Sequence, residues 1–429
     1  MIKHHPYWWD DAGIETPPPA SPSTDIPDQI ETLIVGAGYT GLSAALTLAR
    51  AGRAVTVIDA ERAGFGCSSR NGGLIGPSFH KLGLKGLSKA YGASAANAIL
   101  RESMDSLHAL KTFIQDENIE CGLHKTGRFR GVFDRKDYDQ IARQSEALQK
   151  AVGLEFEMVS PQDQHAEIGS DYYQGGVIYP QDGHLQPARL MLGLRRLALA
   201  AGAKIHAPAR LTGYQRDGDQ WAVTIENAPH RARQILIATN GYTGPELPFY
   251  RRRVLPIRSA ILATAPISPS LMQEISPKNR GFGDSSRLIL YYRPSPDGTR
   301  LIFGGRAFNM TDRPQNYIHD LRRSMQHIFP QLTHTPITHA WSGTVAYSFD
   351  HAPHVGDHEG VYYAMGYCGS GVGRARYFGE KVAYKMLGDA RGKTALDALE
   401  FKSRPLYTGN PWFMPAVLRW NQFADRFGF

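Results

Sequence analysis

A glycine-rich turn near the N-terminus constrains the fold of this chain more than any other feature. Gly36, Gly38 and Gly41 have the spacing G-x-G-x-x-G, and they follow a short β-branched run at residues 33–35. The first glycine permits a tight turn, the second lets the backbone approach a pyrophosphate, and the third lets a helix pack closely on the strand. A second apolar run at residues 55–58 completes a βαβ unit. The sequence therefore predicts a dinucleotide-binding turn in a parallel sheet.

Polar groups around this turn complete the prediction. The helix that begins near Tyr39 and Thr40 would direct its free N–H groups and the positive end of its dipole at the phosphates. Asp59 follows the second strand, where a carboxylate can accept hydrogen bonds from ribose hydroxyls and would repel a 2′-phosphate. These residues predict an NAD- or FAD-type dinucleotide but do not separate the two.

Four later stretches make that distinction. They are residues 64–73, 237–242, 341–356 and 366–372, each rich in glycine or small polar residues. In this order they closely resemble the D-amino-acid-oxidase superfamily of FAD enzymes, and most of all its γ-glutamylputrescine oxidoreductase branch. The resemblance covers the chain from about Tyr7 to its C-terminus. It implies FAD as the cofactor.

The resemblance also implies the fold and the residues that hold FAD. The fold would be mixed α/β, with a Rossmann-type FAD-binding domain of the glutathione-reductase kind interleaved with an antiparallel-sheet substrate domain. A glycine turn that opens a helix supplies backbone N–H groups for the flavin's pyrimidine oxygens. The predicted FAD-binding residues are Gly36, Gly38, Tyr39, Thr40, Gly41, Asp59, Gly66, Cys67, Ser68, Arg70, Asn71, Gly72, Gly73, Arg210, Thr239, Asn240, Gly343, Gly369, Ser370, Gly371 and Val372.

Two residues depart from the family pattern. Ser370 stands where relatives often have His, and Cys368 stands where they often have Ser. Some relatives tether FAD through Cys or His, and Cys67 and Cys368 both fall in flavin-facing stretches. A cysteine in such a place is more often a small buried packing residue, so we expect non-covalent FAD.

The length of the chain, 429 residues, favours two domains rather than one core. Residues 1–29 are expected to form an arm, with Tyr7, Trp8 and Trp9 able to dock on the body. The predicted ranges are 30–84, 156–245 and 337–390 for the FAD-binding domain, 85–155 and 246–336 for the substrate domain, and 391–429 for a C-terminal extension.

The substrate site is expected on the antiparallel sheet. Runs at 289–292 and 301–303 flank a Pro-Asp-Gly turn and predict a hairpin. Arginine has a planar fork that suits a carboxylate or phosphonate, and tyrosine can wall a site and donate a hydrogen bond. Because alternate strand residues point outward, about one of the three arginines should touch substrate. The candidates are Tyr291, Tyr292, Arg293, Arg258 and Arg306.

The expected reaction is oxidation of the C–N bond of an amine or amino acid. Hydride would pass from the carbon beside a neutral amine nitrogen to flavin N5, and the imine would then hydrolyse. A hydroxy-acid C–O dehydrogenase of the same architecture is the alternative. O2 or another acceptor would reoxidise the flavin. Some oxidases of the superfamily place a lysine near N5, but between Gly244 and Trp341 the only lysine is Lys278, in a polar loop, which favours slow oxygen use or another acceptor.

Charge, cysteine content and apolar runs limit which substrates, metal sites and cellular locations are expected. The formal net charge of +8 suits anionic substrates; a nucleic-acid-linked flavoprotein is a less favoured reading, because the arginines do not form a basic helix or tail. Three widely spaced cysteines indicate no disulfide framework and no metal site. No run approaches the ~18–20 apolar residues of a membrane span, and no signal-peptide core is present. We therefore expect a cytoplasmic enzyme with no nucleic-acid partner.

Overall fold

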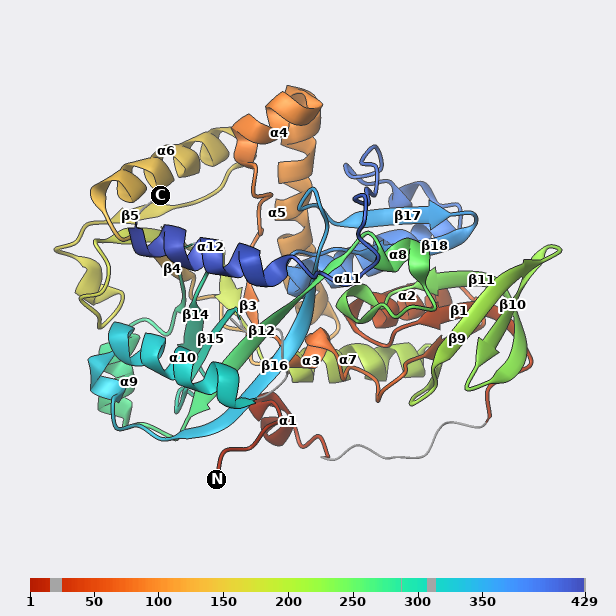
Figure 1. Cartoon of the computed structure of the whole chain (residues 1–429), viewed down its shortest axis with the longest axis horizontal. Coiled ribbons are helices and arrows are strands. Elements are labelled where there is room, and N and C mark those ends of the chain that lie inside the picture. Colours follow the sequence, from red (N-terminus) through yellow and green to blue (C-terminus); the bar gives the residue numbers. More distant parts are fainter. Residues whose placement is uncertain (16–24, 287, 307–313, 428–429) are drawn as a thin grey trace.

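Two large sheets and the helices that cover them form the body of the protein (Figure 1). The computed structural model describes residues 1–15, 25–286, 288–306 and 314–427, while the side chains of residues 306, 315, 316 and 421–427 lie outside the description. Among the described residues, no helix is both long enough and apolar enough to cross a membrane.

The first sheet is built around the predicted βαβ unit. Its central strand β1 (Gln29–Val35) runs parallel to β11 (Ala228–Ile237) and to β2 (Val55–Ile58), so that Val35 is aligned with Ile237 on one side and with Ile58 on the other. The strands are apolar and buried, as expected for a parallel sheet between layers. The path of the sheet is β17 (His354–His358), β18 (Val361–Met365), β11 (Ala228–Ile237), β1 (Gln29–Val35), β2 (Val55–Ile58) and β8 (Lys204–His206), with β10 (Gln220–Ile225) and β9 (Leu211–Asp217) extending from β11.

Helices pack against one another beside this sheet. α2 (Tyr39–Arg50) contacts both α7 (Pro187–Ala200) and α11 (Gly371–Met386), and α11 also contacts α5 (Ala93–Asp116). Pro187 is the first residue of α7, where its missing N–H costs nothing. Residues 83–152 are largely helical and contain α4 (Gly83–Tyr91), α5 and α6 (Arg135–Val152).

The second sheet carries the predicted hairpin. β14 and β15 are antiparallel, with Tyr291 opposite Gly304, and α9 (Pro269–Ile275) and α10 (Pro314–Ile328) add to the core beside them. The path of this sheet is β16 (Ile337–Tyr347), β12 (Leu255–Thr264), β15 (Leu301–Arg306), β14 (Tyr291–Pro294), β13 (Gly281–Asp284), β4 (Arg128–Gly131), β6 (Gly176–Tyr179) and β5 (Glu157–Val159). The mixed α/β fold with two interleaved sheets is as predicted.

Three strands of the second sheet come from ranges predicted for the FAD-binding domain. β5, β6 and β16 all pair within the second sheet, and β16 runs antiparallel to β12 along nearly its whole length. By strand pairing, β5, β6 and β16 belong with the sheet of the substrate domain. The other boundaries of the two domains stay a prediction.

The N-terminal arm docks on the body, as expected from its aromatic residues. In α1 (Tyr7–Asp11), Tyr7, Trp8 and Trp9 are buried. Trp8 Nε1 donates to the Asn71 carbonyl at 2.8 Å, and Trp9 Nε1 donates to Ser69 Oγ at 2.8 Å. The arm thus holds the loop that contains the short helix α3 (Cys67–Arg70).

The remaining short elements complete the chain. β3 (Leu74–Ile75) pairs with β7 (Gly183–His184), and α8 (Pro248–Arg251) precedes β12. The long C-terminal helix α12 (Met414–Phe427) crosses the front of the molecule in Figure 1.

Candidate cofactor and substrate site

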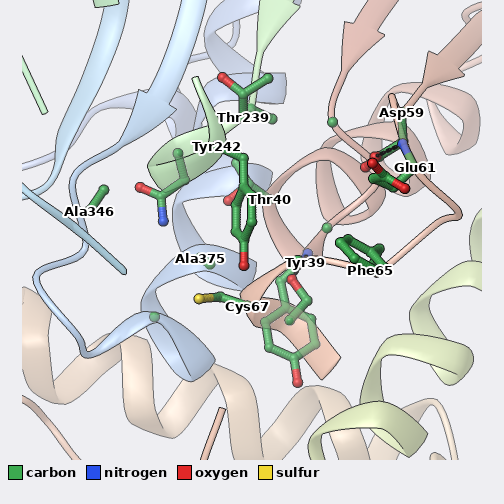
Figure 2. Close-up of a pocket in the computed structure, with 18 of the residues that line it drawn as sticks. Tyr39, Thr40, Asp59, Glu61, Phe65, Cys67, Thr239, Tyr242, Ala346 and Ala375 are labelled. Carbon is green, nitrogen blue, oxygen red and sulfur yellow. Dashed lines mark hydrogen bonds between the residues drawn. The ribbon is translucent and has the colours of Figure 1, made fainter. Parts of the chain in front are cut away.

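A cleft opens where the carboxyl ends of β1, β2 and β11 meet the second sheet. Ligands of open α/β sheets bind at this edge. The cleft encloses about 1400 Å³, its open mouth included, and Figure 2 shows its lining from α2, α3 and the segments after β2 and β11. Of the predicted FAD-binding residues, those that line it are Gly36, Gly38, Tyr39, Thr40, Asp59, Gly66, Cys67, Ser68, Asn71, Arg210, Thr239, Asn240, Gly369, Gly371 and Val372.

The first glycine turn leaves no space for side chains. Gly36 has φ +111°, and a Cβ there would lie 2.8 Å from the Ala238 carbonyl oxygen. A Cβ on Gly41 would lie 1.8 Å from the Gly36 carbonyl oxygen. Gly41 does not face the cleft, and its role is to let α2 start directly against the turn.

The N-terminus of α2 is open toward the cleft. Its N-cap residue, Gly38, has no side chain to cap the helix, and the Tyr39 N–H donates to Ser68 Oγ at 2.9 Å. The first-turn N–H groups of a helix without a side-chain cap attract anions. This end of the cleft can therefore hold a pyrophosphate, with Ser68 as a further polar contact.

Asp59 lies at the opposite rim of the same turn. Its carboxylate accepts hydrogen bonds from the Ala37 N–H at 2.8 Å and the Glu61 N–H at 3.0 Å. Burial raises the pKa of Asp59 to about 6, and the two backbone hydrogen bonds oppose that rise. The group can accept further hydrogen bonds, as recognition of a ribose requires.

A second glycine turn closes the other end of the cleft. Gly369 has φ +86°, and a Cβ there would lie 3.2 Å from the Tyr347 hydroxyl. The Asn240 side-chain oxygen accepts the Gly366 N–H at 2.9 Å, which joins the turn after β11 to this one. α11 begins at Gly371, and its N-cap residue Ser370 provides no side-chain cap. Its free N–H groups and dipole suit the partial negative charge of a flavin pyrimidine ring.

The two open helix ends are held side by side. Thr40 Oγ1 and the Tyr367 hydroxyl are 2.8 Å apart, and Ser43 Oγ donates to the Arg376 carbonyl at 2.7 Å. A Cβ on Gly379 would lie 2.4 Å from the Thr40 carbonyl oxygen, so α11 crosses α2 backbone against backbone. This contact fixes the distance between the two ends of the cleft.

Both cysteines of the flavin-facing stretches make hydrogen bonds. Cys67 Sγ donates to the Thr344 carbonyl at 2.9 Å, and burial raises the pKa of its thiol to about 11. Cys368 Sγ donates to the Gly366 carbonyl at 3.1 Å, and burial raises the pKa of that thiol too. Both thiols are therefore protonated near neutral pH and are poor nucleophiles.

Several predicted cofactor residues support the cleft from behind. Arg70 Nε donates to the Phe65 carbonyl, and its guanidinium lies over the Phe65 ring. Gly73 packs against the Leu185 carbonyl and Arg293, with φ +74°. The predicted residues absent from the lining of the cleft are Gly41, Arg70, Gly72, Gly73, Gly343 and Ser370.

Other residues of the cleft were missed by the sequence analysis. The Tyr242 ring stands between Thr239 and Cys67 in Figure 2, and its hydroxyl accepts the Thr344 N–H at 3.1 Å. Most of these residues lie inside the four stretches noted in the sequence, which was the available signal, but no spacing rule singles them out. They include Glu61, Phe65, Tyr242, Ala346, Tyr367 and Ala375.

Arg293 is a structural residue, which corrects its prediction as a substrate contact. Its guanidinium is 1% exposed and donates to the carbonyls of Gly72 at 2.8 Å and Leu185 at 2.6 Å. It also lies 3.0 Å from His184 Nδ1, and burial lowers the pKa of Arg293 to about 9. The side chain clamps the loop after α3 to the segment before α7. Arg293 is buried in these contacts and does not line the cleft, so it is not placed to bind a substrate carboxylate there.

Tyr292 belongs to the core of the second sheet, which is a second correction. Its ring stacks between Phe282 and Phe303, at 5.2 Å from each, and its hydroxyl lies 2.8 Å from that of Tyr173. Strand alternation gives the reason, since adjacent residues of β14 point to opposite faces and only one of the tyrosine pair can face the cofactor side.

Tyr291 lies on that other face. Its hydroxyl is 2.8 Å from Ser259 Oγ, and a Cβ on Gly72 would lie 2.7 Å from its ring. Ser259 is paired with Gly343, where a Cβ would lie 3.4 Å from Cys67 Sγ in the wall of the cleft. Burial raises the pKa of Tyr291 to about 12, so the phenol is protonated at neutral pH.

The other two arginines are placed by strand register. Arg258 is half-buried in β12 and adjacent to Ser259, so alternation puts it on the opposite face. Arg306 ends β15 and is paired with Ser259; its side chain lies outside the described part of the chain.

The comparison with protein families settles the class. The model of the family "FAD dependent oxidoreductase" (DAO) matches residues 31–385, which is most of the chain. The protein belongs to this family. Its cofactor is therefore FAD. The cofactor fits the cleft, because a side-chain-free turn, two helix starts without side-chain caps and a partly buried carboxylate all border it.

Individual relatives agree with this assignment. The chain is 31% identical to "Probable oxidoreductase OrdL" of Rhizobium meliloti (strain 1021), over 98% of each chain. It is 28% identical to "Gamma-glutamylputrescine oxidoreductase" of Escherichia coli (strain K12), over 84% of each. A solved glycine oxidase from Geobacillus kaustophilus has the same fold, with a TM-score of 0.73, 18% identity, and coverage of 88% of this chain and 99% of that one.

Proposed function

We propose that this family member oxidises the C–N bond of an amine or amino acid that carries a carboxylate or phosphonate group. The Tyr291–Ser259 hydroxyl pair carries the proposal, because it stands on the sheet face beside the Cys67 wall of the cleft. The relatives support it: one bears the name of an oxidoreductase of an amine, and a structural neighbour is a glycine oxidase.

When bound, FAD supplies a two-electron acceptor for a hydride at N5. The chain's own task is orientation and exclusion of water. Ser259 Oγ donates to the Gly305 carbonyl at 2.9 Å, so the protonated Tyr291 hydroxyl donates to Ser259 Oγ and its free lone pair can accept a hydrogen bond from the substrate amine. The apolar side chains of Phe65, Val345 and Ala346 in the lining of the cleft would keep water away from the reacting carbon.

The substrate amine must arrive neutral, because its lone pair drives the loss of hydride. His184 is not needed as a base. Its ring is fully buried and engaged by Arg293 and the Asn279 carbonyl, and burial holds its pKa well below the usual range. The imine product then hydrolyses without further help from a titrating side chain.

Arg306 is the best candidate for the anionic group of the substrate. Paired residues on neighbouring strands share one face of a sheet, and Arg306 is paired with Ser259. We expect Arg306→Met to raise KM for anionic amines about tenfold or more while kcat changes little, since a charged hydrogen bond is worth about 1.5–3 kcal/mol. Arg258→Met is the matched control on the opposite face.

An anaerobic titration tests the reaction. The yellow protein is mixed without oxygen with amines, N-substituted amino acids and hydroxy acids, and the flavin absorbance is followed. Bleaching by amines that carry an anionic group supports the proposal. Bleaching by hydroxy acids alone would establish the C–O alternative instead.

We further propose non-covalent FAD, because both nearby thiols are protonated and hydrogen-bonded. Acid precipitation should leave the flavin in the supernatant; colour in the pellet would contradict this. Lys278 pairs with Glu167 in its loop, which supports slow oxygen use or an acceptor other than O2. A cytoplasmic location, without a nucleic-acid partner, also remains a prediction.

A further inference from the structure

Two histidines and an aspartate meet where the N-terminal arm crosses the edge of the second sheet. His5 Nε2 lies 2.7 Å from Asp10 Oδ1, and His339 Nε2 lies 3.0 Å from Asp10 Oδ2. One ligand atom from each of the three residues lies within 4.8 Å of the other two. The cofactor and substrate residues described above do not include any of them.

The backbone holds these residues together across more than three hundred positions. The Lys3 N–H donates to the Thr338 carbonyl at 2.8 Å, and the Ala340 N–H donates to the Lys3 carbonyl at 2.9 Å. Lys3 therefore extends the edge of β16 beside His339, and α1 then returns Asp10 over the same spot. The juxtaposition is a consequence of register and is not a chance meeting of mobile side chains.

The His339 ring is aimed at the cluster. It is 5% exposed, and its Nδ1 lies 2.9 Å from Thr338 Oγ1, so Nε2 is the nitrogen that faces Asp10. In metal sites, a hydrogen-bond partner on the ring nitrogen that does not bind the metal orients the histidine, and Thr338 Oγ1 is such a partner for His339 Nδ1. The His5 ring lies edge-on to His339, with the ring centres 5.7 Å apart.

We propose that His5, Asp10 and His339 bind a divalent transition metal such as Zn²⁺, as a structural site that fastens the arm to β16. Two imidazoles and a carboxylate are ligands that Zn²⁺ prefers, with bonds of about 2.0–2.2 Å and tetrahedral geometry. The ligand atoms would then stand about 3.2–3.6 Å apart. The distances of 2.7 and 3.0 Å are to different oxygens of Asp10, and one ligand atom from each residue lies within 4.8 Å of the other two, so each side chain must shift by about 1 Å to reach this geometry. A water molecule would complete the shell.

A competing cation already contacts the carboxylate. Lys3 Nζ lies 2.5 Å from Asp10 Oδ2, with a side chain that is 56% exposed. A metal would displace this ammonium into solvent. The affinity for the metal should therefore rise when the Lys3 side chain is removed. If the cluster were only a set of ion pairs, removal of Lys3 would create no tighter metal site.

A metal bound to the arm should stabilise the cofactor cleft, because the arm contacts residues of the cleft. Trp8 donates to the Asn71 carbonyl and Trp9 to Ser69, and Asn71 lines the cleft. A metal that holds the arm should therefore slow loss of FAD as well as raise the unfolding temperature.

The test uses the full-length FAD-bound protein after treatment with a chelator, titrated with Zn²⁺ by calorimetry and by thermal unfolding. We expect one Zn²⁺ per chain and a rise in Tm. His5→Ala should weaken binding at least about tenfold, and Lys3→Ala should tighten it several-fold. His4→Ala is the matched control, because His4 is exposed and outside the cluster, and it should bind as the parent does.

Three results would overturn the proposal. They are no heat of binding up to about 1 mM Zn²⁺, equal binding by His5→Ala and the parent, or weaker binding by Lys3→Ala. His339→Gln removes the buried ligand and should also weaken Zn²⁺ binding. If the His339→Gln protein does not fold, the result with His5→Ala, whose side chain is accessible, is the one that tests the proposal. The outcome is independent of which substrate the flavin oxidises.

Discussion

Glycines leave room for close contacts both at the cofactor turn (residues 36–41) and at the sheet face that carries Tyr291, the proposed substrate wall, but the neighbouring atoms differ. At the turn, the missing Cβ atoms of Gly36 and Gly41 would meet carbonyl oxygens of the main chain, at 2.8 and 1.8 Å. At the wall, the missing Cβ atoms of Gly72 and Gly304 would meet the Tyr291 ring, at 2.7 and 2.3 Å. A ring can turn about its χ angles, whereas the main chain of a packed sheet cannot. The cofactor end is therefore rigid, and the substrate wall is adjustable.

The largest effect is expected at the rigid end. Gly41→Ala should abolish FAD retention and cost about 3 kcal/mol or more of unfolding free energy, because α2 would be pushed off the turn. Gly304→Ala should keep FAD and raise KM for the amine about tenfold, because only the Tyr291 ring must shift. Flavin absorbance of the purified proteins, urea unfolding and steady-state kinetics measure these effects.

Gly213→Ala is the control, since no heavy atom lies within 4 Å of a Cβ at this position of β9. It should retain FAD with nearly unchanged stability. The comparison between the two ends fails if Gly41→Ala remains yellow while Gly304→Ala does not.

The next effect separates a structural arginine from a substrate arginine. Arg293→Met leaves the carbonyls of Gly72 and Leu185 without their donors and should lower the unfolding free energy by about 2–4 kcal/mol. KM of the folded protein should change little. Arg135→Met, on the exposed face of α6, should stay within about 0.5 kcal/mol of the parent. A large rise in KM at unchanged stability would return Arg293 to the substrate site.

The adjacent tyrosines of β14 offer a matched pair. Tyr291→Phe removes the hydroxyl beside the cleft and its hydrogen bond to Ser259, and it should lower kcat/KM about tenfold as well as cost about 1 kcal/mol of stability. Tyr292→Phe removes the hydrogen bond to Tyr173 in the core and should cost about 1 kcal/mol of stability, with kcat/KM unchanged. Kinetics and urea unfolding of both variants distinguish the two faces; the reverse pattern would show that their roles have been exchanged.

The smallest effect is a pH dependence at Asp59. Ribose hydroxyls favour the ionised carboxylate, so bound FAD lowers a pKa that is about 6 in the free cleft. The affinity for FAD should therefore fall about fourfold between pH 7 and pH 5.5. Fluorescence titration of the deflavinated protein measures this change. Asp59→Asn should bind more weakly but show a flat profile in this range, and an equal slope in that variant would assign the effect to another group.

The stability of the FAD-free protein should depend on pH in the opposite direction to the affinity for FAD. Its raised Asp59 pKa means that this group's contribution to stability is fully present below about pH 4, where the carboxyl is protonated in both states, and is lost as the pH rises through about 6. Deflavinated protein should accordingly gain stability from this group on mild acidification while it loses affinity for FAD.

The glycine turns were predictable because their requirement is local. A turn that must pass close to a pyrophosphate demands glycine at fixed spacing, and this demand appears directly in Gly36, Gly38 and Gly41. Tyr242 lies inside the stretch 237–242 and Glu61 follows Asp59 by two positions, but neither obeys such a spacing rule, so both were missed. For Tyr292 and Arg293 the residue type suggested chemistry, and only their burial revealed packing.

The dinucleotide turn, the βαβ unit with its acid at Asp59, the hairpin and the docking aromatics of the arm could be predicted from the chain alone, because each depends on neighbouring residues or on backbone geometry. FAD, as distinct from another dinucleotide, was implied by the resemblance of four distant stretches to a family. The tertiary structure alone decided which side of β14 faces the cofactor, which arginine is a clamp, and that His5, Asp10 and His339 meet. These outcomes depend on strand register and on contacts between distant segments, and a change of one residue in register would reverse them.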